Sequence, residues 1–147
     1  MTYKQYNTAS RRHLDTCKCL LYDLETNTDR SYDKSHLYQN LFYLSGYIIE
    51  MILKYRIYKE LSFDKSKDIE TLQTDKITYQ GDICIHSLVK LYRTLSKISS
   101  YDLPINARNL SGWGWDVKCR YETKAMTEGE IRAFYDIAKD TFGKLYN

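Results

Sequence analysis

The sequence is poor in the features that break helices or anchor a chain in a membrane. Its 147 residues include a single proline, Pro104, whereas a chain folded into many short strands and turns would contain more. It has no run of about 18 apolar residues, so no membrane-spanning helix is expected. The N-terminal residues MTYKQYNTASRRH contain no apolar signal core. These absences predict a soluble, cytoplasmic protein without membrane contact.

Residues typical of metal and phosphate-loop sites are equally sparse. The four cysteines form no CxxC pair and have no paired metal-ligand spacing: they are Cys17, Cys19, Cys84 and Cys119. No G-x-x-x-x-G-K-[ST] phosphate loop occurs. We therefore expect free thiols in a reducing compartment, and neither a metal nor a cofactor. The net charge of +3 is too small to identify a nucleic-acid-binding protein, but it allows a local basic site.

Tyrosine, in contrast, is abundant, with 15 residues. It joins a large ring to a hydroxyl that needs a hydrogen-bond partner, so it suits the edges of cores and interfaces. A surface on which bases stack is the alternative use. The length suits a single domain covering residues 1–147, with a core that needs neither disulfides nor metal.

Residues 36–61 are the stretch around which the chain is organised. Apolar side chains recur there at steps of three and four, which forms a continuous stripe on a helix: Leu37, Leu41, Leu44, Ile48, Ile52 and Tyr55. A second stripe lies on a neighbouring face: Phe42, Ile49, Leu53 and Ile57. A helix that needs apolar cover on more than half its circumference lies at the centre of a domain. Glu50 and Lys54 have the spacing of a favourable pair on an exposed helix face.

The first helix is predicted to begin at Thr8 or Ser10, either of which can cap it, and to end near Glu25. Its first turn would then contain three basic residues, Arg11, Arg12 and His13. Positive charge there opposes the helix dipole, which hints at an anionic partner or reflects a solvated helix end.

Two more helices follow the central one. Residues 62–82 read as a loose excursion with one short helical turn near residues 67–73, and residues 83–99 then form the third helix. Residues 105–123 read as irregular. Thr127 and Glu130 have the spacing of a capping box that starts the last helix. The sequence therefore predicts an all-α domain, an antiparallel bundle of four to five helices.

Three segments make this chain resemble the HEPN family of helical bundles, which occur in prokaryotic toxin, defence and nucleotidyltransferase-linked proteins. The central segment GYIIEMILKYRI is similar to the family's E-x-x-x-K pattern through Glu50 and Lys54. The segment HSLVKLY begins at His86, and WDVKCRY runs from Trp115 to Tyr121, just before the capped last helix. The resemblance implies a homodimer that uses the ends of the second and last helices, and a possible nucleotidyltransferase-type partner protein.

The chain departs from the family's ribonucleases in one motif. Those enzymes carry Arg, four to six residues and then His near the start of the last helix. Arg120 stands near that place, but no histidine follows it, because the final histidine is His86. An Arg-x5-His string does occur from Arg30 to His36, but at the wrong end of the bundle. The chain therefore resembles the members that bind nucleotides or RNA, or act as partner subunits, without the usual nuclease motif.

The segment GWGWDVKCRY holds most of the candidate binding residues. Trp115 could stack on a base while Arg120 holds a phosphate, assisted by Lys118 and Tyr121. Glu50 and Lys54 complete the candidate set. In the alternative interpretation, Trp115 plugs the end of the bundle and Arg120 pairs with a carboxylate such as Glu50 or Asp116.

Two other functions remain open from the sequence. His86 could approach Arg120 in space and rebuild an Arg/His pair, giving an active, metal-independent ribonuclease. His86 could equally satisfy a buried carbonyl group. The remaining alternative is a structural partner subunit that binds no ligand.

Overall fold

The computed structural model describes residues 1–29 and 33–147, and within them every regular element is a helix. Its α-helices are α1 (Lys4–Thr26), α2 (Ser35–Glu60), α3 (Leu88–Ile98), α4 (Ala107–Trp113) and α5 (Glu128–Leu145). Shorter turns are the 3-10 helices η1 (Ile69–Thr71) and η3 (Val117–Arg120) and the π-helical η2 (Tyr79–Ile83). The predicted all-α class is confirmed, and the helices pack as a bundle.

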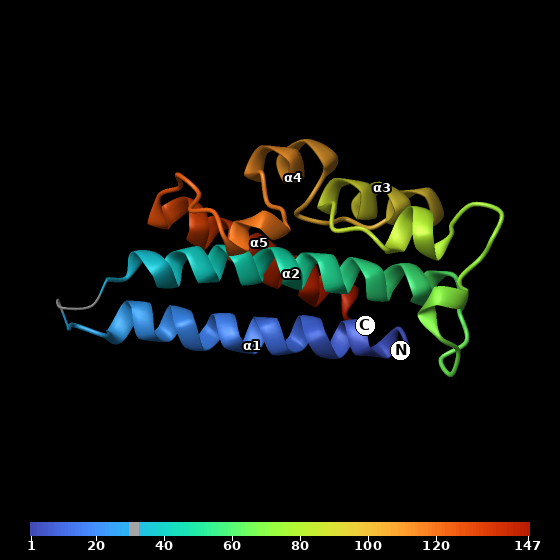
Figure 1. Cartoon of the computed structure of the whole chain (residues 1–147), viewed down its shortest axis with the longest axis horizontal. Helices are drawn as coiled ribbons and strands as arrows, with labels where there is room; N and C mark the ends of the chain where they lie inside the picture. The colour runs from blue at the N-terminus through green and yellow to red at the C-terminus, as the bar shows by residue number, and fades with distance from the viewer. Residues whose placement is uncertain (30–32) are drawn as a thin grey trace.

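Helix α2 lies at the centre of this bundle. It packs against α1, α3, α5 and η3, and Figure 1 shows α1 running antiparallel along one side with α3 and α4 on the opposite side. Both predicted stripes face the core, which includes Leu41, Phe42, Ile48, Ile49, Ile52, Leu53 and Ile57, each at most 1% exposed. The prediction of a central helix is therefore confirmed.

The first helix begins earlier than predicted. Helix α1 starts at Lys4, so neither Thr8 nor Ser10 caps it. Ser10 is instead fully buried, and its hydroxyl donates to the backbone oxygen of Ile48 across the α1–α2 contact at 2.9 Å. The basic residues from Arg11 onward lie about two turns inside the helix, where the dipole no longer distinguishes charge. The premise for an anionic partner at this helix end was therefore wrong.

The elements after α2 agree in part with those predicted from the sequence. Thr127 and Glu130 form the predicted capping box at the start of α5. The excursion after α2 contains the expected short turn, η1, but it is anchored: Ile69 is buried, and its backbone oxygen accepts from the Tyr58 hydroxyl at 2.7 Å. Residues 107–113, predicted to be irregular, form α4, which begins with a capping box of Asn106 and Asn109.

Trp115 joins the segment after α4 to the central helix. Its indole lies directly over Gly46, where a Cβ atom would come within 2.0 Å of Nε1. The indole N–H donates to the backbone oxygen of Tyr43 at 3.0 Å, and the Tyr47 ring meets the indole edge-on at 5.2 Å. Gly46 is therefore required for space, because any side chain at this position would displace the indole.

We expect Gly46→Ala to lower the free energy of unfolding by about 1–3 kcal/mol, because the added methyl group overpacks the contact with Trp115. Gly143→Ala is the matched control. Gly143 lies in α5, and a Cβ atom there would meet no atom within 4 Å, so alanine should be neutral or stabilise by about 0.5–1 kcal/mol. Urea denaturation followed by circular dichroism measures both. Equal midpoints for the two variants would contradict the role of Gly46.

Candidate functional site

Glu50 is the centre of a buried polar cluster in the middle of α2. Its side chain is fully buried, and Lys54, whose side chain is 6% exposed, donates to Oε1 at 2.7 Å. His86, just before α3, places Nδ1 at 3.1 and 3.2 Å from the two carboxylate oxygens. The Glu50–Lys54 pair is thus buried and does not lie on an exposed helix face.

Aromatic side chains surround this cluster. The Lys54 ammonium lies 5.7 Å from the centre of the Tyr6 ring, a cation–π contact. Burial, together with nearby groups that include Glu50, raises the pKa of Tyr6 and Tyr47. Burial and the neighbouring Arg12 lower the pKa of His13. The charge of Glu50 therefore acts in surroundings where tyrosine and His13 remain neutral near pH 7.

The contact with Glu50 orients His86 for proton transfer. A carboxylate only accepts, so Nδ1 carries the proton and donates to it, and in the neutral imidazole Nε2 then presents a lone pair. The His86 side chain is 56% exposed and lines a cavity of about 270 Å³. Ser87, Ser111 and Asp116 line the same cavity. This arrangement can act as a general base toward a hydroxyl bound there.

Arg120 belongs to a different region. It is exposed at the end of η3, with its guanidinium 5.8 Å from the centre of the Tyr43 ring. Hydrogen bonding to Tyr121, followed by the influence of Tyr43, raises the pKa of Arg120. Arg120 is not among the residues that line the His86 cavity. The two halves of the suggested Arg/His pair therefore contact different groups.

The remaining candidates divide between core and surface. Trp115 is 6% exposed and packs over Gly46 near the middle of α2, not at the end of the bundle as the plug interpretation expected, and it lines the same cavity as His86. Lys118 is exposed, and Tyr121 is 83% exposed. Within the described residues Arg120 forms no ion pair, with Glu50, Asp116 or any other carboxylate. The surface candidates of this segment are therefore Lys118, Arg120 and Tyr121.

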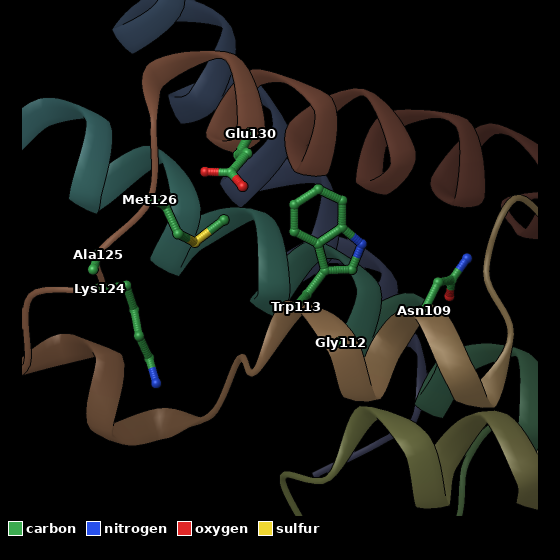
Figure 2. Close-up of a pocket in the computed structure, with 7 residues that line it drawn as sticks. All are labelled: Asn109, Gly112, Trp113, Lys124, Ala125, Met126 and Glu130. Carbon is green, nitrogen blue, oxygen red and sulfur yellow. The ribbon is translucent and has the colours of Figure 1, made fainter.

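A larger cavity, of about 530 Å³, lies beside this segment and was not predicted. Figure 2 shows Trp113 at its centre, with Met126 and Glu130 on one side and Asn109 on the other. Lys124 lies at its edge. The two glycines and two tryptophans of residues 112–115 marked the neighbourhood, but Glu130 had been assigned only a capping role. Tertiary packing places Lys124 and Glu130 around the same cavity as Trp113, and no local sequence pattern indicates this.

Only His36 of the Arg-x5-His string can be placed. Arg30 lies outside the described residues. His36 is exposed on the first turn of α2, with Nε2 at 3.7 Å from Asp33. Within residues 1–29 and 33–147, no group of three or more His, Cys, Asp or Glu side chains is arranged to hold a metal ion.

Comparison with known proteins finds no matching family model, no matching curated protein and no matching solved structure. None of the helices in the described part of the chain is both long and apolar enough to cross a membrane. Functional inference therefore depends on the geometry of three regions: the Glu50–His86 cluster, the exposed residues around Arg120 and the cavity beside Trp113.

We expect Glu50→Leu to lower the free energy of unfolding by about 3–5 kcal/mol, because it leaves the Lys54 ammonium buried without a counter-charge. The double variant Glu50→Leu/Lys54→Met removes both charges and should recover most of this loss. Lys18→Met is the surface control: Lys18 forms an exposed pair with Asp15 at 3.6 Å, so its loss should cost about 0–1 kcal/mol. Denaturant titrations of the four proteins measure these differences. A double variant no more stable than Glu50→Leu would contradict the pairing.

Proposed function

We propose that this chain is a HEPN-like module that binds nucleotides or RNA in a cytoplasmic prokaryotic defence or toxin–antitoxin type system. The observation that supports it best is an exposed basic and aromatic surface before α5. Lys118 and Arg120 are exposed and form no ion pair within the described residues, and the Tyr121 ring is 83% exposed. We call these three residues the η3 strip.

The η3 strip has the chemistry of a weak single-strand binding surface. A phosphate would accept hydrogen bonds from Arg120, whose guanidinium is held against the Tyr43 ring, and from Lys118. A base would stack on Tyr121, since base–aromatic stacking requires only an exposed ring face. Asp116 and Glu122 lie in the same segment and reduce its net positive charge. Stacking therefore contributes a large share of the expected affinity.

The family part of the proposal draws on the position of the E-x-x-x-K pair and of the η3 strip. Glu50 and Lys54 lie at the centre of α2, and the strip precedes the capped last helix. We extend the proposal to a homodimer formed through the ends of α2 and α5, with a nucleotidyltransferase-type protein as a candidate partner.

We expect Lys118→Ala/Arg120→Ala to weaken binding of single-stranded RNA and to make it less dependent on salt. The slope of log affinity against log salt should fall by about 1.4, because each lost phosphate contact contributes about 0.7. Tyr121→Ala should weaken binding by about 1–3 kcal/mol without changing the slope. Fluorescence anisotropy with a labelled oligonucleotide at several salt concentrations measures both effects.

Lys65→Ala is the matched control for this series, because Lys65 is an exposed lysine in the segment between α2 and η1. It should bind RNA as the wild type does. If the wild type binds no RNA, or if Lys65→Ala weakens binding as much as the double variant, the η3 strip is not the binding surface.

The Glu50–His86 pair favours a second candidate function, a metal-independent ribonuclease. In this reaction His86 Nε2 would take the proton of a 2′-hydroxyl while its oxygen attacks the adjacent phosphorus, and Glu50 would stabilise the charged imidazole. The bond from phosphorus to the 5′-oxygen breaks, and the leaving oxygen takes its proton from water. Arg120 would contribute only if the substrate spans from the His86 cavity to the η3 strip.

This second function predicts cleavage of single-stranded RNA in EDTA, leaving 2′,3′-cyclic phosphate ends. His86→Gln should abolish cleavage, because glutamine cannot take up the proton, while RNA binding should persist. Denaturing gel electrophoresis of labelled RNA measures cleavage, and native gel electrophoresis measures RNA binding. Intact RNA after prolonged incubation with the wild type would leave binding as the function.

A further inference from the structure

The 530 Å³ cavity between α4, the connection 121–127 and the start of α5 has the size of a small-ligand site. Trp113 forms its aromatic wall. The Trp113 ring is only partly buried and packs against Phe134, with the ring centres 5.2 Å apart. Figure 2 shows Met126 and Glu130 near the ring on the cavity side. A planar ligand can therefore lie against an indole whose orientation is fixed from behind.

Glu130 presents an acceptor to this cavity. Its Oε2 accepts from the Thr127 backbone N–H at 2.7 Å and from the Thr127 hydroxyl at 3.0 Å. These bonds, the backbone one first, hold the pKa of Glu130 below its usual range, so the carboxylate stays ionised near pH 7. Oε1 forms no hydrogen bond to another described residue. An ionised carboxylate can only accept, so a ligand must offer N–H or O–H groups here.

Lys124 provides a positive charge at the cavity edge. Its backbone is fixed by the side-chain amide of Gln39, which donates to the Lys124 oxygen at 3.1 Å and accepts from its N–H at 3.0 Å. The ammonium forms no ion pair within the described residues, and Lys124 follows the η3 strip residues Arg120 and Tyr121 closely in the chain. A phosphate at the cavity mouth can therefore be neutralised without breaking an existing contact.

We propose that this cavity binds a guanine base, with Glu130 selecting guanine and Lys124 holding its phosphate. Among the four RNA bases, only guanine offers two adjacent N–H donors, N1–H and the N2 amino group, on its Watson–Crick edge. Adenine, cytosine and uracil each place an acceptor beside their single donor group, which the carboxylate would repel. This inference rests on the proposed nucleotide-binding function and gives it a base preference.

The test is isothermal titration of the protein with GMP, AMP, CMP and UMP. The wild type should bind GMP at least about tenfold more tightly than the other three, because N1–H and the N2 amino group of guanine both donate to the one free acceptor, Oε1. Glu130→Gln should lose about tenfold or more for GMP, because the free acceptor becomes an amide donor. Its oxygen can still accept from Thr127, so the capping box and the fold are retained.

Glu128→Gln is the matched control, since Glu128 is an acid of the same helix turn that does not line this cavity. It should leave GMP affinity unchanged. Equal affinity of the wild type for the four nucleotides, or an unchanged GMP affinity in Glu130→Gln, would overturn the guanine assignment.

Two further variants separate this inference from the proposed function. Lys118→Ala/Arg120→Ala should weaken RNA binding and leave GMP affinity unchanged, because neither residue lines the cavity. Lys124→Ala should weaken GMP binding but leave binding of guanosine, which has no phosphate, unchanged. RNA binding without guanine preference overturns the cavity assignment alone, whereas guanine-selective GMP binding without RNA binding overturns the η3 strip alone.

Discussion

The burial of α2 on nearly all sides is the constraint on which the rest of the structure depends. A helix in this position cannot leave a charge or an N–H group without a partner, because desolvation of a lone ion costs several kcal/mol. Glu50 therefore comes with Lys54 and His86, and Ser10 comes with the Ile48 backbone oxygen. The polar contacts of the core follow from the position of this one helix.

Close approach over Gly46 places the η3 strip relative to that helix. Trp115 can reach the Tyr43 backbone oxygen only because Gly46 has no side chain. This contact fixes the start of η3, so Arg120 lies over the Tyr43 ring and Tyr121 remains in solvent. The buried tryptophan therefore anchors the exposed residues that follow it.

Helix positions could be predicted where periodic burial determines them, and the functional clusters could be predicted only in part. The stripes of α2 and the Thr127–Glu130 cap could be recognised because they are local patterns. The predicted start of α1 was wrong because a serine can either cap a helix or donate a hydrogen bond to a neighbouring helix. Ser10 does the second, since the Ile48 backbone oxygen lies within reach. Helix α4 was missed because the glycines at 112 and 114 indicated irregular structure, and the Asn106–Asn109 cap was not recognised. The Trp113 cavity depends on three segments that only packing brings together.

One stripe of α2 supports both candidate regions. Tyr43, Tyr47, Glu50 and Lys54 follow at steps of four, three and four, which places them on one helix face. Tyr43 and Tyr47 join through their hydroxyl groups at 3.2 Å, and their rings contact Arg120 and Trp115, whereas Glu50 contacts both Lys54 and His86. These aromatic and charged side chains position Arg120, Trp115 and His86 from a single rigid element.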